Sequence, residues 1–185
     1  TVIAVLAGLV NKQIVASLTS MGAKTVGFTG VDGGMLQAHI SDPEMGLVGD
    51  ITRVNPELLL HSLESGYMPI IAPLGFHFDH SSREAPAILN VNGDTVAGEL
   101  AVAVGAHGVI FLTDVDGVMD LSSRVIPKLT IGQAKLLLSN GVVHGGMIPK
   151  MQACLRAMEQ VNQAHVIDGR KSGALIDCIY GKAQG

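Results

Sequence analysis

The sequence is short of charged and aromatic residues. Of its 185 residues, 15% are Asp, Glu, Lys or Arg, 3% are aromatic, and Trp is absent. The net charge is −4 and no stretch is densely basic. A protein that binds nucleic acid needs a basic surface, so we expect no nucleic-acid partner, and an anionic ligand must be held by a few placed groups. The hydrophobic fraction of 48% indicates a compact globular chain.

Cysteine and long apolar segments are also scarce. Cys154 and Cys178 are the two cysteines, without a CxxC motif or a Cys/His metal spacing. We interpret both as reduced core residues of a protein in a reducing compartment. No apolar run reaches the ~20 residues that a membrane span needs, and the opening residues lack the pattern of a signal peptide. We therefore expect a cytoplasmic protein without a membrane partner.

Several catalytic signatures are missing. The seven histidines show no HxxxH or HExxH spacing, and GxSxG, Cys–His and P-loop motifs are absent. A metal-ligand cluster and a covalent nucleophile are therefore not expected, and no residue is assigned to a metal. What remains is Lys, Asn, Asp and glycine backbone. Phosphoryl transfer without a covalent intermediate requires such parts, because it depends on positioning and on neutralisation of charge.

Hydrophobic periodicity alternates between that of helices and that of strands. The expected helices lie at 2–21, 55–66, from the Asn92 region to about 105, 130–141, 147–160 and 173–181. The expected strands lie at 24–30, 35–40, within 41–51, 68–75, 108–113 and 164–169, with a hairpin tip at 76–86. Apolar strands that alternate with helices predict a parallel sheet covered on both faces. Ligands of such sheets bind at the carboxyl ends of the strands.

The segment "NVNGDTVAG" (90–98) carries an unusual density of polar side chains at a helix start. One side chain is enough to cap a helix, so a cap alone accounts for only one of Asn90, Asn92 and Asp94. An Asn side chain both donates and accepts, which suits a substrate with carboxylate and amide groups. Asp94 suits the holding of a lysine. Simple capping remains the alternative.

Two further motifs favour a nucleotide. "TDVDGV" (113–118) is an acidic turn after a strand, either a plain turn or a nucleotide contact in which Gly117 allows a close approach. "HGGMIPK" (144–150) opens a helix with two glycines and places Lys150 early, where the helix dipole disfavours a cation. A phosphate at this helix start would explain the lysine, and a solvated surface lysine is the alternative. "GVDGG" (30–34) is either a turn or a phosphate loop.

These motifs occur in an order that resembles the amino acid kinase superfamily, and within it the N-acetylglutamate kinases. The matching segments cover essentially the whole chain: "LAGLVNK" (6–12), "GFTGVDGG" (27–34), "GLVGDI" (46–51), "NVNGDTVAG" (90–98), "FLTDVDGV" (111–118), "GGMIPK" (145–150) and "AHVIDGR" (164–170). The resemblance implies one α/β domain, a three-layer αβα sandwich with a central, mainly parallel sheet. A substrate lobe would extend to about residue 105 and a nucleotide-binding lobe would follow from about 106.

The resemblance also implies an activity and its site. The activity is the ATP- and Mg2+-dependent phosphorylation of the side-chain carboxylate of N-acetyl-L-glutamate, the second step of arginine biosynthesis. Asn90 and Asn92 would bind the substrate, Asp94 would organise the catalytic lysines, and Lys150 would stabilise the transferred phosphoryl group. The residues implied at the nucleotide are Thr113, Asp114, Val115, Asp116, Gly117, Val118, Met119, Val142, Val143 and His144. A homo-oligomer, dimer or hexamer, and arginine as a feedback effector are implied as well.

The sequence departs from the family at its ends. Family members carry a K-x-G-G strand, a second G-G loop and an arginine before the position where this sequence starts, so we expect the 185 residues alone to be inactive. Gly93 stands where the family usually has Ala, a change we expect to be tolerated. Three alternatives stay open: a related acylamino acid kinase, a carbamate kinase, or an inactive kinase-like regulatory domain of the type fused to N-acetylglutamate synthases.

Overall fold

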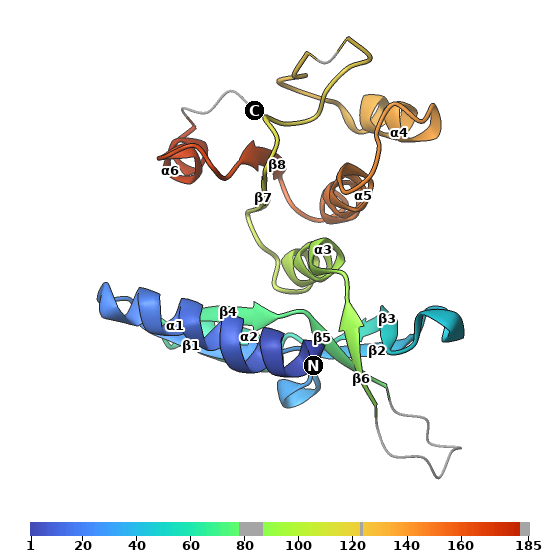
Figure 1. Cartoon of the computed structure of the whole chain (residues 1–185). Coiled ribbons are helices and arrows are strands. Elements are labelled where there is room, and N and C mark those ends of the chain that lie inside the picture. Colours follow the sequence, from blue (N-terminus) through green and yellow to red (C-terminus); the bar gives the residue numbers. More distant parts are fainter. Residues whose placement is uncertain (78–86, 123, 182–185) are drawn as a thin grey trace. The chain divides into compact units, whose positions relative to one another are not determined.

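A computed structural model describes residues 1–77, 87–122 and 124–181, and it contains both helices and strands throughout its length (Figure 1). A π-helical stretch, Ala4–Val10, runs directly into α1. The helices are α1 (Asn11–Ser20), α2 (Glu57–Glu64), α3 (Gly93–Ala103), α4 (Ile131–Ser139), α5 (Met147–Ala157) and α6 (Ala174–Ile179). The strands are β1 (Thr25–Thr29), β2 (Leu36–Ile40), β3 (Val48–Val54), β4 (Met68–Ala72), β5 (Leu74–His77), β6 (Ala87–Val91), β7 (Gly108–Thr113) and β8 (Gln163–Asp168).

The expected helices are confirmed, and so are most strands, with shifts of a few residues at their ends. The strand expected at 68–75 is instead divided at Pro73 into β4 and β5, and no strand was expected where β6 lies. Residues 76 and 77 of the predicted hairpin tip (76–86) belong to β5, and residues 78–86 lie outside the described residues. The two flanking strands β5 and β6 do pair antiparallel. The chain forms two compact units, Thr1–Val96 and Ala97–Gly185, and the boundary falls within α3. The division expected near residue 105 would instead keep α3 whole, and it stays a prediction.

The first unit is built on a parallel pair that leads into a small strand ring. β1 pairs with β4 in parallel, from Thr25 opposite Met68 to Thr29 opposite Ala72. Pro73 follows directly and cannot donate a ladder hydrogen bond. β5 begins after Pro73 and joins β2, β3 and β6 in a closed four-stranded arrangement. The largest fully buried side chains of the described residues belong to these strands or lie next to them: Met35, Leu36, Leu74 and Leu89.

One buried amide fastens α1 to the β1–β4 pair. Asn11 is 3% exposed, and its Nδ2 donates to the carbonyl oxygens of Phe28 (3.2 Å) and Ile70 (2.8 Å). The amide therefore contacts both strands at once. A Cβ at Gly27 would lie 2.1 Å from Asn11 Oδ1, which explains the glycine inside β1.

The second unit is a parallel pair with helices on both sides. β7 and β8 run in register from Gly108 opposite Gln163 to Thr113 opposite Asp168. Helices α5 and α6 flank this pair (Figure 1). Its core cluster consists of Ala101, Val109, Phe111, Ala153, Ala157 and Val161. The fold is therefore α/β with parallel strand pairs, as the sequence predicts. Over the described residues, no helix combines the length and the apolar character required to cross a membrane.

Candidate functional site

Asn90 lies in β6, in the first unit, and presents its side chain away from the core. Its backbone N–H donates to the Leu47 carbonyl at 2.9 Å. The neighbours Leu89 and Val91 are buried, at 0% and 2% exposure, whereas Asn90 is half-buried. Because side chains alternate along a strand, Asn90 points to the other side of β6. The backbone of Asn90 therefore takes part in strand pairing, and its side-chain amide is the group that a ligand can contact.

Asn92 has a different task, since it caps α3. Its Oδ1 accepts from the backbone N–H groups of Asp94 (2.9 Å) and Thr95 (3.1 Å). The capping interpretation therefore holds for Asn92, and a substrate contact through this oxygen would compete with the cap. Asp94 is half-buried in the first turn, where the helix dipole favours a negative charge. A Cβ at Gly93 would meet Pro73 Cγ at 4.0 Å, so the site has room for Ala.

The acidic turn after β7, in the second unit, is exposed at its tip and anchored at its end. Asp114, Val115 and Asp116 are exposed, whereas Gly117 and Val118 are buried. Gly117 has a φ of 145°, a conformation that L side chains rarely adopt. Thr113 accepts from Gly169 N–H at 2.8 Å through its carbonyl. Met119 forms a bridge to Val125. A ligand could therefore reach the side chains of the tip but only the backbone at its end.

A charge network at the ends of β7 and β8 was not predicted from the sequence. Asp168 is 5% exposed and accepts from Arg170 Nε and Nη2, both at 2.9 Å, and from Arg170 N at 3.0 Å. This contact lowers the pKa of Asp168 to about 2. Lys171 Nζ lies 2.6 Å from Asp116 Oδ1, which raises the pKa of Lys171. The sequence did contain a signal for this network, because both cations lie within three residues of the end of β8 and Asp114 directly follows β7.

The segment 141–150 ends α4 and opens α5. Gly141, with a φ of 67°, ends α4. Val143 is 6% exposed and shares a core cluster with Val118, Ala134 and Met151, whereas His144 is exposed. The cluster therefore joins the two segments that the sequence assigns to the nucleotide. The side chains of Val118 and Val143 support these segments from inside, so at these two positions any nucleotide contact is made by the backbone.

The start of α5 is open at its glycines. Among the described residues, no side chain caps this helix, and a Cβ at Gly145 or Gly146 would meet no heavy atom within 4 Å. The N–H groups of Met147 and Ile148 already donate to the His144 and Gly145 carbonyls, at 3.2 and 3.1 Å, and Pro149 has none. The backbone therefore offers an anion less than the sequence predicts. Half-buried Lys150 is the main positive group.

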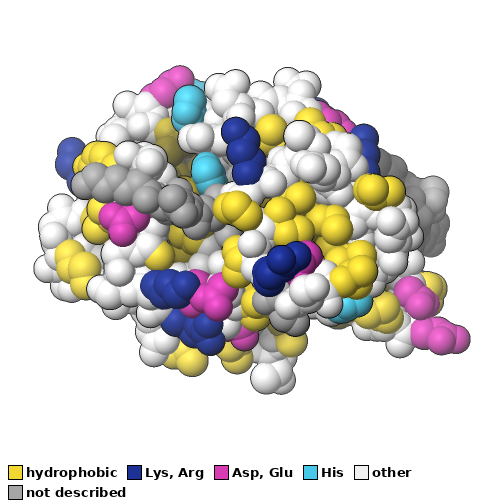
Figure 2. Space-filling model, turned by 90° about the horizontal axis from the view of Figure 1, so that it is seen from above, with side chains coloured by type: hydrophobic (Ala, Val, Ile, Leu, Met, Phe, Trp, Pro, Cys, Tyr) yellow, Lys and Arg dark blue, Asp and Glu magenta, His cyan; other side chains and the backbone are white. Residues whose placement is uncertain are grey.

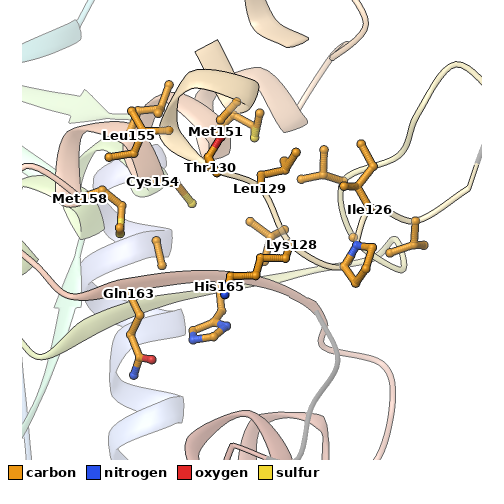
Figure 3. Close-up of a pocket in the computed structure, with 18 of the residues that line it drawn as sticks. Ile126, Lys128, Leu129, Thr130, Met151, Cys154, Leu155, Met158, Gln163 and His165 are labelled. Atoms are coloured by element: carbon orange, nitrogen blue, oxygen red, sulfur yellow. The ribbon is translucent and has the colours of Figure 1, made fainter. Parts of the chain in front are cut away.

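The second unit contains a cavity of about 740 Å3 with a mostly apolar lining, and it shares few residues with the motifs described above. Met151, Cys154 and Leu155 of α5 form one wall with Met158, which follows this helix, opposite the segment 126–130 (Figure 3). Its lining includes Gly117 and Val118 but no other residue assigned to substrate or nucleotide. Lys128, Thr130 and His165 are polar members of this mostly apolar lining. Because the cavity shares so few residues with the motifs, we assign the chemistry to the polar motifs.

The surface charge is mixed. On the face in Figure 2, Lys and Arg side chains lie among acidic and hydrophobic ones, and neither sign forms a continuous field. No group of three or more His, Cys, Asp and Glu side chains suited to a metal ion occurs in the part of the chain that is described. An anionic ligand therefore has to be held by individual groups, such as Lys150.

Comparison with known proteins supports a kinase-type fold. An acetylglutamate kinase of Dehalococcoides mccartyi is 42% identical over 175 residues, which are 95% of this chain and 64% of the relative. The chain thus spans somewhat less than two thirds of that relative's length. Two solved structures share the fold. One is N-acetylglutamate synthase from Neisseria gonorrhoeae, complexed with coenzyme A and N-acetyl-glutamate, with a TM-score of 0.76 at 21% identity. The match covers 92% of this chain and 38% of the synthase chain.

The second solved structure is carbamate kinase from Giardia lamblia bound to AMP-PNP. It has a TM-score of 0.71 at 11% identity, over 96% of this chain and 71% of that one. Both structural likenesses show the fold alone. The model of the amino acid kinase family matches residues 1–168, which include every residue assigned above to substrate and nucleotide. The chain therefore belongs to the amino acid kinase family.

Proposed function

We propose that the protein transfers the γ-phosphoryl group of MgATP to the side-chain carboxylate of N-acetyl-L-glutamate, a step of arginine biosynthesis. The observation that carries the proposal is the 42% identity to an acetylglutamate kinase across 95% of the chain. The polar turn with Asn90 and Asp94 and the open start of α5 with Lys150 support it. The chemistry needs no covalent intermediate on the protein, in keeping with the motifs of the sequence.

In the proposed reaction, a carboxylate oxygen of the substrate attacks the γ-phosphorus in line, and ADP leaves with the electron pair of the broken P–O bond. Asn90 holds the acylamino acid through its side-chain amide. Lys150 neutralises charge on the phosphoryl oxygens during transfer, and Asp94 orients lysine. Most of the rate enhancement comes from positioning and charge stabilisation. Mg2+ enters with the nucleotide, bound mainly by phosphate oxygens and water.

The nucleotide is proposed to lie on residues 113–119 and 142–144. Asp114, Asp116 and His144 are exposed there and can contact ribose or base through their side chains. Val118 and Val143 contribute backbone groups, because their side chains are in the core. Asn92 contributes indirectly, by holding the start of α3 through its cap.

We also propose that the protein is a homo-oligomer, a dimer or a hexamer, in the cytoplasm, with arginine as a feedback effector. The first helical segment supports the oligomer. Val2, Val5 and Leu9 are 53%, 41% and 53% exposed, and they lie on one side of a helix whose other side carries Asn11. The side with Asn11 packs on the β1–β4 pair, so the exposed apolar side is the one that another subunit could cover. Sedimentation of the full-length protein tests the assembly, and added arginine tests the inhibition.

The activity is tested by trapping its product. Full-length protein with MgATP, N-acetyl-L-glutamate and hydroxylamine should give an acyl hydroxamate and one ADP for each hydroxamate. A Lys150→Ala preparation made in parallel controls for contaminating kinases. Carbamate in place of the acylamino acid tests the carbamate kinase alternative. Binding of N-acetyl-L-glutamate by calorimetry without any ADP release would instead favour a regulatory, kinase-like domain.

A further inference from the structure

Helices α3 and α5 approach each other closely inside the second unit. A Cβ at Gly98 of α3 would lie 3.1 Å from the carbonyl oxygen of Ala153 and 3.3 Å from its Cβ. Ala101 on α3 and Ala153 and Ala157 on α5 belong to one buried cluster. Small side chains let two helices pack tightly. They also give the contact few protruding groups that would fix how one helix slides or rotates on the other.

One ion pair supplies the missing restraint. Arg156 of α5 donates to Glu99 of α3 through Nε to Oε1 at 2.7 Å and through Nη2 to Oε2 at 3.2 Å. This two-point contact fixes direction as well as distance. Glu99 lies directly after Gly98, and Arg156 lies between Ala153 and Ala157, so the pair flanks the close approach of the helices.

Arg156 has a second carboxylate partner that makes a natural control. Its Nη1 also donates to Glu159 Oε2. Glu159 lies three residues further along the chain, just after α5, so this contact does not reach α3. Removal of Glu99 or of Glu159 takes one carboxylate from the same guanidinium, but only the first loss uncouples the helices.

We propose that Glu99 and Arg156 are positioning residues for phosphoryl transfer. The inference rests on the proposed function. α3 is continuous from the turn with Asp94 to Ala103, and α5 carries Lys150 near its start. The ion pair therefore ties the helix that begins with the proposed substrate motif to the helix that carries the proposed phosphoryl-binding lysine. Neither side chain contacts the reacting atoms.

A stabilising role alone predicts something different. The side chains of Arg156 and Glu99 are 44% and 22% exposed, and partly exposed ion pairs contribute little to the free energy of unfolding. Misplacement of a catalytic group by about 1 Å can nevertheless lower a rate about 100-fold. The pair should therefore affect kcat far more than thermal stability.

The test compares Glu99→Gln with Glu159→Gln in the full-length protein, at a temperature well below unfolding. Glu99→Gln should lower kcat by about 10- to 100-fold, with the KM values of both substrates within about twofold and little change in Tm. Glu159→Gln should keep kcat within about twofold. Arg156→Lys should fall between them, because an ammonium group cannot make the two-point contact. Equal kcat values for the two Gln variants would overturn the proposal.

A second measurement does not depend on the substrate. Amide hydrogen exchange of residues 147–157 should be several times faster in Glu99→Gln than in wild type, and unchanged in Glu159→Gln. If the wild type makes no acyl phosphate, the proposed function fails, and this comparison still decides whether Glu99 restrains α5. Equal exchange in both variants contradicts the coupling of the two helices.

Discussion

Helices α3 and α5 both begin at motifs to which the sequence assigns a function, but their starts are satisfied differently. At α3, Asn92 of the chain itself accepts from two backbone N–H groups. At α5, no side chain of the described residues provides a cap, and turn carbonyls accept from the N–H groups of Met147 and Ile148. Two glycines leave space around this start, so Lys150 is the group that an anion can reach. A helix start that is capped by a side chain of the chain itself contributes to the stability of the fold. A start without such a cap can instead contribute to ligand binding. Substitutions at the first should therefore change stability, and substitutions at the second should change kinetics.

The largest effect is expected at the open start. Lys150→Ala should lower kcat by about 100- to 1000-fold, because removal of one preorganised donor from a site of developing charge costs that much. KM should change far less, since the charge peaks during transfer. Steady-state kinetics of the full-length protein measures both. A raised KM with normal kcat would show that Lys150 binds substrate without stabilising the transfer.

The next largest effect is expected at Asn90, beside the capped start. Asn90→Ala should raise KM for the acylamino acid by about 10- to 100-fold, since a hydrogen bond to a charged group is worth about 1.5–3 kcal/mol. KM for ATP should stay nearly constant. Calorimetric titration with each ligand separates the two, and a selective loss of ATP binding would place Asn90 at the nucleotide instead.

A smaller effect, of another kind, is expected at Asn92. Asn92→Ala should cost about 1 kcal/mol of stability, the usual value of a lost N-cap, and should reduce Tm with little change in either KM. Asn92→Asp keeps a capping oxygen and serves as the matched control. Denaturant unfolding measures the difference. A large rise in KM for the acylamino acid in the Ala variant would show that Asn92 binds the substrate.

The smallest effect is expected at Asp168, a second group that is satisfied by its own chain. Its contact with Arg170 keeps the folded pKa at about 2, below the ~3.9 of an unperturbed Asp. The contact therefore stabilises the fold fully above pH ~4, and this stabilisation is lost as the pH falls towards 2. The Tm difference between wild type and Asp168→Asn should shrink over that interval. A difference independent of pH would show that the charge is irrelevant.

The sequence predicted the elements well because its signals were local. The apolar strands 108–113 and 164–169 and the glycine ends of helices depend on neighbouring residues only. The division of labour within "NVNGD" was not predictable in that way. Which Asn caps and which faces a ligand depends on where β6 ends, a boundary set by pairing with β3 and β5.

Long-range contacts were out of reach for the same reason. Arg156 lies 57 positions after Glu99, and no local sequence pattern around either residue predicts that the two are in contact. Val118 and Val143 stand within motifs that suggest a nucleotide, yet they pack in one core cluster. Motif reading assigns a role to a segment, whereas burial decides which atoms of the segment can perform it.

The contact between Asn11 and Gly27 has a consequence for how this chain can vary. A methyl group at position 27 would overlap the Asn11 amide oxygen, which lies 2.1 Å from the site of such a Cβ. A shorter side chain at position 11 would relieve the overlap but release the carbonyls of Phe28 and Ile70 from their shared donor. Neither position can therefore change alone without loss. Across related sequences, an alanine at position 27 should occur together with a smaller residue at position 11, and the two sites should covary as a pair.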